Sequence, residues 1–129
     1  METKFNFKSQ VCTDRFQSER LLALGLKKET ADMCHFWHWE SDDYSRLCAS
    51  WEFAHRSNKD IPAWSLHRLI EMIQTVFVRV NLCGWWVHIE RKVHNKEYFA
   101  DVHNDLFDNI IDCIEWLIKE GYFNKEYLV

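Results

Sequence analysis

Residues that can bind a metal ion gather first at positions 34–48. Cys34, His35 and His38, with Cys48 further along, carry the thiol and imidazole groups that zinc prefers. Structural zinc sites pair their ligands on both sides, however, and only the first side is paired here. In a strand, His35 and His38 would also point to opposite faces, because their separation is odd. The pattern therefore favours residues that flank a core, and we expect no metal ion and no cofactor.

A second candidate is Glu90-Arg91-Lys92, which has the E-x-K spacing of metal-dependent nucleases. In such sites a carboxylate holds the cation and the lysine helps to activate water. Another acid is needed from a preceding strand or turn, where the candidate is Asp60, placed just before a helix with a structural role. A match to so short a motif is weak, so an exposed, charged strand face is the favoured interpretation.

Other catalytic patterns are missing from the sequence. No serine sits in a nucleophile elbow, no glycine-rich loop follows a strand, and no cysteine lies where a helix dipole and a histidine would activate it. Acyl transfer and nucleotide-phosphate binding are therefore unsupported. We expect no catalytic residues, and an enzyme is the less favoured class.

Cationic residues concentrate in the segment 75–96. They are Arg79, Arg91, Lys92 and Lys96, against the single acid Glu90. With Trp86 and His88 beside them, this strand face can contact a phosphate backbone and stack on bases. The net charge of −4 has the wrong sign for such binding. We therefore expect the acidic segment 101–129 to lie nearby and neutralise the basic residues, which leaves nucleic-acid binding as an alternative.

The hydrophobic pattern predicts the elements that position these residues, beginning with two segments in the first half of the chain. A helix from about Thr13 to Leu24 is capped by Thr13 or Asp14 and ends at Gly25. Its apolar positions are Phe16, Leu21, Leu22 and Leu24. A strand follows from Cys34 and ends at a polar turn over 41–43. Residues 44–55 fit a strand or a helix, of which we favour the helix.

The second half of the chain gives stronger patterns. Ser65 can cap a helix in which Trp64 packs on Leu69 as a hydrophobic staple, with an apolar stripe formed by Leu66, Leu69, Ile70 and Ile73. Strands are predicted over 75–82, 85–93 and 97–102. A last helix begins at Asn104 and ends at Gly121, and its inward residues are Leu106, Ile110, Cys113, Ile114 and Leu117.

These elements predict an α+β fold. An antiparallel sheet of about three strands has the N-terminal, central and C-terminal helices packed against it. A chain of 129 residues with 47% hydrophobic residues fits a single domain over 1–129. No signal peptide or membrane-spanning run is visible, and the five cysteines follow no paired spacing, so we expect a soluble, cytoplasmic protein with reduced thiols.

Two segments, 17–33 and 61–72, resemble a family of small proteins encoded in prophages and conjugative elements of gut anaerobic bacteria. Trp85-Trp86 before a strand and a C-terminal helix that ends in Gly121-Tyr122 also fit this family, whereas residues 34–59 depart from it. The resemblance implies a mobile-element origin and a bacterial cytoplasm. The family has no assigned activity, so no catalytic residue is carried over.

The seven tryptophans exceed the need of one small core, so some of them should lie at the surface or in an interface. The candidates are Trp37, Trp39, Trp51, Trp85 and Trp86. Because Val87 and Ile89 share the parity of Trp85, we predict Trp85 inward and Trp86 outward, beside His88. We therefore expect a non-enzymatic accessory protein that binds a protein partner or itself. The alternatives are a metal-dependent nuclease and a nucleic-acid-binding protein.

Overall fold

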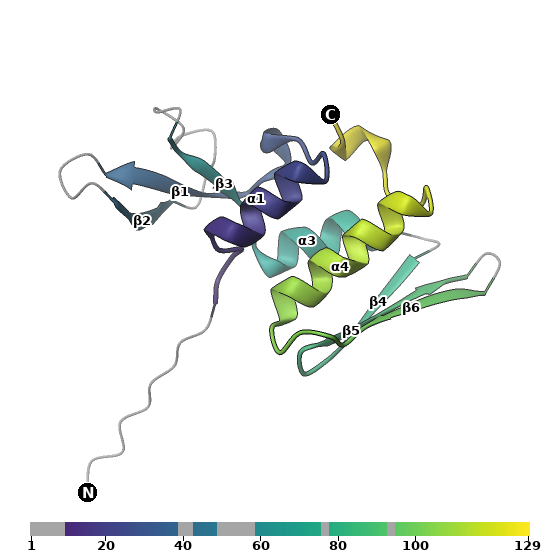
Figure 1. Ribbon diagram of the computed structural model, residues 1–129. Coiled ribbons are helices and arrows are strands. Elements are labelled where there is room, and N and C mark those ends of the chain that lie inside the picture. The colour runs from purple at the N-terminus through teal and green to yellow at the C-terminus, as the bar shows by residue number, and fades with distance from the viewer. Residues whose placement is uncertain (1–9, 39–42, 49–58, 76–77, 93–94) are drawn as a thin grey trace, which may run out of the picture.

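The described part of the chain contains three α-helices and two three-stranded antiparallel sheets in the computed structural model (Figure 1). The described residues are 10–38, 43–48, 59–75, 78–92 and 95–129. The helices are α1 (Arg15–Ala23), α3 (Leu66–Ile73) and α4 (Leu106–Lys119), with 3₁₀ turns at Lys28–Thr30 and Lys125–Tyr127. The first sheet has the order β2-β1-β3 and the second the order β4-β5-β6. Their strands are β1 (Met33–His38), β2 (Asp43–Cys48), β3 (Ile61–Ala63), β4 (Val78–Cys83), β5 (Trp86–Arg91) and β6 (Lys96–Ala100).

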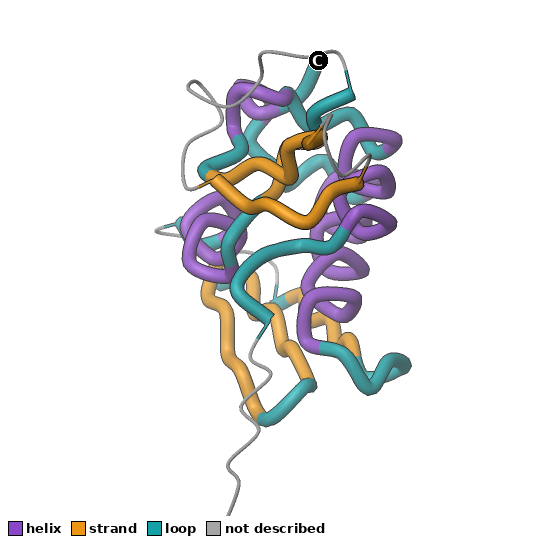
Figure 2. The backbone as a smooth tube through the Cα atoms, turned by 90° about the vertical axis from the view of Figure 1, so that its left-hand side faces the viewer, coloured by secondary structure: helices purple, strands orange, loops and turns teal. Residues whose placement is uncertain are grey.

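The helices lie between the two sheets, and Figure 2 shows the same separation from a direction turned by 90°. Helix α4 contacts β5 and β6, α3 contacts β4, and α1 contacts α4 and β3. The predicted α+β fold is therefore confirmed, including the three-strand meander with helices packed against it. No helix in the described ranges is long and apolar enough to cross a membrane.

The core fills the space between α4 and the inner face of the β4–β6 sheet. Val87 and Ile89 of β5 alternate toward this core, and both are fully buried. From α4, the predicted inward residues Ile110, Cys113, Ile114 and Leu117 are buried with them. The strand and helix periodicities in the sequence therefore identified the two surfaces that meet here.

Helix α1 begins and ends at the capping residues that the sequence predicted. Asp14 accepts a hydrogen bond from the backbone N–H of Gln17, whose side chain accepts one from the N–H of Asp14, so the helix begins with a capping box. At the other end Gly25 has φ +103°, and the N–H of Leu26 donates to the carbonyl of Leu21. Phe16 was wrongly placed in the apolar stripe, because its side chain is 78% exposed on the first turn.

In the first sheet the strand predicted from Cys34 is present as β1, but its two partner strands were not predicted. Residues 44–48 form a strand rather than the favoured helix, and Cys34 of β1 lies opposite Cys48 of β2. On its other side Cys34 pairs with Pro62, since β3 is an edge strand where the missing N–H of proline can be tolerated. The remaining part of the predicted helix, 49–55, lies outside the described residues, as does most of the predicted turn at 41–43.

Helix α3 begins as predicted, but its buried face differs. The Ser65 hydroxyl accepts from the N–H of Arg68, and Trp64 and Leu69 are both fully buried. The buried face of α3 includes Met72, whereas Ile70, which was predicted in the apolar stripe, is partly exposed. In α4, Asp105 rather than Asn104 caps the helix, by accepting from the N–H of Asp108.

Candidate functional site

The outer face of the β4–β6 sheet is the face turned away from α4. Its residues are those that alternate with the buried Val87 and Ile89 and their cross-strand neighbours. They are Arg79, Asn81 and Cys83 of β4, Trp86, His88 and Glu90 of β5, and Glu97 and Phe99 of β6. In the register, His88 lies between Asn81 and Phe99, and Glu90 lies between Arg79 and Glu97. Polar and aromatic groups that are far apart in the sequence therefore meet on one surface.

Aromatic side chains occupy one end of the outer face. Trp86 is 51% exposed and Phe99 is 59% exposed, although both are large and apolar. The Phe99 ring stacks on the His88 imidazole, with 4.1 Å between ring centroids and an interplanar angle of 7°. Aromatic surface of this kind is more typical of an interface than of a free surface.

Trp85 was predicted to point inward, and this prediction is wrong. Its side chain is 48% exposed. Trp85 lies with Gly84, at φ +62°, in the turn between β4 and β5, and β5 begins only at Trp86. The alternation that places Val87 and Ile89 inward does not extend into a turn. Trp37 of β1 is partly buried, and Trp39 and Trp51 lie outside the described residues.

Ionisable side chains occupy the middle and the other end of the outer face. The Nδ1 atom of His88 is 3.9 Å from Oε1 of Glu90, and its Nε2 atom is 3.9 Å from Oε2 of Glu97. Asn81 adds its amide nitrogen at 3.3 Å from Nδ1 of the same ring. One imidazole and two carboxylates thus converge, each offering a ligand atom within 4.8 Å of the others.

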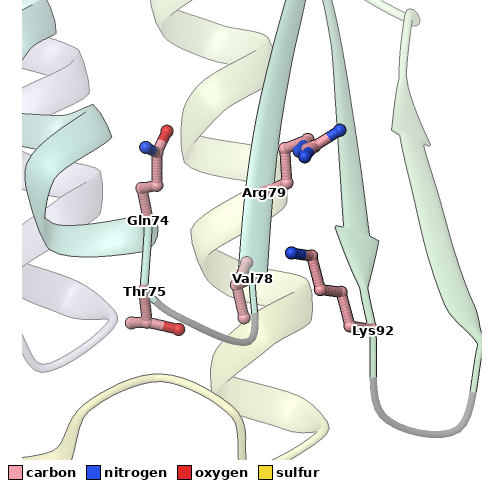
Figure 3. Close-up of a pocket in the computed structure, with 5 residues that line it drawn as sticks. All are labelled: Gln74, Thr75, Val78, Arg79 and Lys92. Carbon is pink, nitrogen blue, oxygen red and sulfur yellow. The ribbon is translucent and has the colours of Figure 1, made fainter.

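Two shallow pockets share Lys92 in their lining, and the second of them includes Glu90 and Glu97. The first, of about 200 Å³, has Arg79 and Lys92 in its lining together with Gln74, Thr75 and Val78 (Figure 3). The second, of about 250 Å³, is lined by Glu90, Arg91, Lys92, Asn95 and Glu97. Lys92 therefore lies where a positive charge can assist an anionic ligand of either pocket.

The predicted binding residues do not all share this face. Trp86, His88 and Arg79 lie on it and Lys92 follows at its end. The Arg91 guanidinium instead lies 3.3 Å from the centre of the Tyr122 ring, beside the C-terminal segment. The expected basic strand face is thus divided between the two sides of the sheet.

The acidic C-terminal segment neutralises only part of the positive charge of the segment 75–96. Lys96 pairs with Glu120 at 3.1 Å. The α4 residues Asp112 and Glu115 instead hold Arg20 of α1, at 2.5 Å and 2.8 Å, and this arginine lowers the pKa of Glu115. Within the described residues, α4 makes no ion pair with Arg79 or Lys92.

The residues of the discounted zinc pattern lie on the first sheet. Cys34 is fully buried, and Nε2 of His35 lies 2.7 Å from the carbonyl oxygen of Thr13. The side chains of His38 and Cys48 lie outside the described residues. Asp60 accepts from the N–H of Trp37 at 2.9 Å, so it supports this sheet and does not join Glu90.

The described cysteines, Cys12, Cys34, Cys83 and Cys113, are free of disulfides. Burial raises the pKa of Cys12 to about 11 and that of Cys113 to about 12, so both remain thiols at neutral pH. Cys83, in contrast, is exposed on the outer face. Cys12 and Cys113 therefore lack the depressed pKa that a catalytic nucleophile needs.

Sequence reasoning missed Glu97, Asn81 and Phe99 as members of the site. It sought the second acid before Glu90, whereas the second acid follows it, on the next strand of the meander. The expected hairpin pairing of Glu90 with Glu97 could have identified this second acid, because the register brings the two residues side by side.

Comparisons of the chain with protein-family models, with curated proteins and with solved structures found no match.

Proposed function

We propose that this protein is a non-enzymatic binding protein whose outer face associates with the outer face of a second copy. The observation that carries the proposal is the exposure of Trp86 and Phe99, each more than half exposed on the face that no helix of the described residues covers. Burying two such side chains on each copy removes a large apolar area from water. Tryptophan and phenylalanine are also enriched at the centres of protein interfaces.

The charges of the outer face favour a second copy as the partner. Arg79 and Glu97 lie at the same level on the two opposite edge strands, β4 and β6. A twofold axis parallel to the strands would place β4 over β6 of the second copy, and therefore Arg79 opposite Glu97 in both directions. Trp86, on the central strand, would meet its own symmetry mate. Glu90 would also meet its own symmetry mate. The nearby Arg79 side chains would offset the repulsion between the two Glu90 carboxylates.

Substitution of Trp86 tests this proposal. We expect Trp86→Ala to weaken self-association by roughly tenfold or more, as for a residue at an interface centre. The free energy of unfolding of the monomer should change by less than about 1 kcal/mol, since the side chain is exposed. Sedimentation equilibrium over a range of concentrations measures the first quantity, and urea unfolding at low concentration measures the second.

Phe16→Ala is the matched control, because Phe16 is another exposed aromatic residue, 78% exposed, but lies on α1. It should leave self-association unchanged. A wild-type protein that stays monomeric at high concentration would contradict the proposal, as would a Trp86→Ala variant that associates as strongly as the wild type.

The mobile-element origin and the cytoplasmic location follow from the resemblance of 17–33 and 61–72 and are part of the proposal. An accessory protein that assembles with itself fits a chain whose sequence offers no nucleophile and no activated base. The genes that neighbour this one test the origin directly. Integrase, relaxase or capsid genes nearby support it, and a neighbourhood of housekeeping genes contradicts it.

A second candidate function, metal-dependent cleavage of a nucleic acid, is favoured by one specific observation. Glu90 of the E-x-K motif acquires a second acid, Glu97, and Lys92 lines the same pocket. A cation held by the two carboxylates would activate a water for attack on phosphorus, and the bond to the leaving ester oxygen would break.

This candidate predicts nicking of supercoiled plasmid in the presence of Mg²⁺ or Mn²⁺. Removing one carboxylate that holds the cation should lower the rate by roughly a hundredfold or more, so Glu90→Gln should abolish visible nicking. Gel electrophoresis of the plasmid over time measures it. Equal nicking by wild type and Glu90→Gln would contradict the assignment, because the activity would then come from another source.

A further inference from the structure

His88, on the outer face, has a ring nitrogen that its hydrogen bonds leave unsatisfied. Its side chain is 19% exposed and is held between the Phe99 ring and the β4 strand. The Nε2 atom is buried and has no hydrogen-bond partner among the residues that the structure describes. A buried polar nitrogen without a partner costs free energy, so a ligand that satisfies it would stabilise the face.

Glu97 is the nearest candidate to satisfy this nitrogen, but it lies too far away. The distance of 3.9 Å between Nε2 and Oε2 exceeds that of a hydrogen bond. A zinc ion with bonds of roughly 2 Å to each atom spans such a gap. Glu90, on the same strand as His88, lies on the Nδ1 side of the ring, with Oε1 at 3.9 Å from Nδ1, and completes the group within 4.8 Å. The two glutamates are 40% and 56% exposed, so their side chains can adjust to close a coordination shell.

Asn81 supplies the support that a metal-binding histidine requires. Its amide group lies 3.3 Å from Nδ1 of His88. In the structure the amide nitrogen of Asn81 faces Nδ1, and a half-turn of the amide group would let its oxygen accept from Nδ1–H. The lone pair of Nε2 would then be directed at Glu97. The Phe99 ring fixes the orientation of the imidazole plane from the other side.

We propose that His88, Glu90 and Glu97 form a binding site for one divalent transition-metal ion on the outer face. The ligand set of one imidazole and two carboxylates fits Zn²⁺ and similar ions better than Mg²⁺ or Ca²⁺, which bind through oxygen alone. Three protein ligands leave a coordination position open to water. The sequence predicted no metal ion, because the three residues come together only through the pairing of β5 with β6. The proposal rests on contacts of these three residues within one chain, and not on self-association or nucleic-acid cleavage, although Glu90 and Glu97 also lie on the surface proposed for self-association.

Zinc binding to the full-length protein tests this site. Equilibrium dialysis with elemental analysis should give one zinc per chain for the wild type. Glu97→Gln and His88→Ala should each weaken binding by roughly tenfold or more, as loss of a ligand does at least as much as loss of its supporting partner. Glu97 is exposed, so its variant keeps the test valid if His88→Ala proves unstable. Competition with Mg²⁺ in excess should leave the zinc in place.

His67→Ala is the matched control, because Nε2 of His67 also lies 3.9 Å from a glutamate, Glu71, but no third ligand joins them among the described residues. It should bind zinc as the wild type does. Cys83→Ser should also retain zinc, and the cobalt-substituted protein should lack the strong absorption of a thiolate ligand. No zinc on the wild type, equal binding by Glu97→Gln, or loss on Cys83→Ser would overturn the site. Retention of zinc by Trp86→Ala separates this result from the self-association test.

Discussion

Replacing Ile114 with aspartate should abolish the cooperative fold or lower its free energy of unfolding by several kcal/mol. Ile114 is fully buried near the middle of α4, between Ile110 and Leu117 on the face that contacts β5 and β6. A carboxylate there would lose its hydration, and the neighbouring core residues are apolar. The cost combines an unpaired buried charge with the loss of apolar contacts. Urea unfolding followed by tryptophan fluorescence and far-ultraviolet circular dichroism measures it.

Ile114→Val is the matched control, because it removes one methylene group and keeps the site apolar. It should cost about 0.5–1.5 kcal/mol and leave a sharp transition. A soluble Ile114→Asp variant that melts at the wild-type temperature would contradict the placement of this face of α4 in the core.

The sheet β4–β6 and helix α4 could be predicted because each carries one unambiguous period. Val87 and Ile89 alternate over a whole strand, and Ile110, Ile114 and Leu117 recur at helical spacing, so each pattern fits only one element. The first sheet could not be predicted in the same way. Its strand β2 shares apolar spacings with a helix, and β3 is a three-residue strand that contains Pro62. Pairing with β1 decides both, and pairing is not a local property of the sequence.

The outer face shows the same division between local and non-local information. Parity placed Trp86 and His88 on one side of the sheet, and both lie there. Parity failed for Trp85, because the strand begins one residue later. The convergence of Glu97 with His88 depends on the register across the β5–β6 turn, which no single-strand pattern contains.

The second large effect concerns Asn109, a polar residue that is fully buried in the first turns of α4. Its Nδ2 donates to the carbonyls of Trp85, at 2.6 Å, and His103, at 3.0 Å, and its Oδ1 accepts from the N–H of His103 at 3.1 Å. One side chain therefore ties the helix to the turn that precedes β5 and to the loop before α4. Both N–H groups of the side-chain amide and its oxygen therefore have partners in these two segments.

Asn109→Asp should lower the free energy of unfolding by about 3 kcal/mol or more at neutral pH. The carboxylate keeps the shape of the amide, but it loses both donated hydrogen bonds and faces two carbonyl oxygens in a buried site. Because Trp85 precedes Trp86 directly, the released turn should also weaken self-association. Urea unfolding at several pH values measures the first effect, and sedimentation equilibrium measures the second.

The pH dependence of this variant identifies the cause. Burial and the two carbonyls disfavour the charged form, so the pKa of the introduced aspartate should be higher in the folded than in the unfolded protein. A carboxyl group whose pKa is higher in the folded than in the unfolded protein lowers the free energy of unfolding as the pH rises from the unfolded pKa to the folded pKa. This loss of stability disappears below the unfolded pKa, where the group is protonated in both states. The difference in unfolding free energy between wild type and Asn109→Asp should therefore decrease as the pH falls from about 7 to about 4.

Asn124→Asp is the control, because the exposed Asn124 uses its side-chain oxygen as an acceptor from the N–H of Glu126, a role that a carboxylate retains. It should change the unfolding free energy by less than about 0.5 kcal/mol at any of these pH values. Equal stability of Asn109→Asp and wild type at neutral pH would show that Asn109 does not join the turn to the helix.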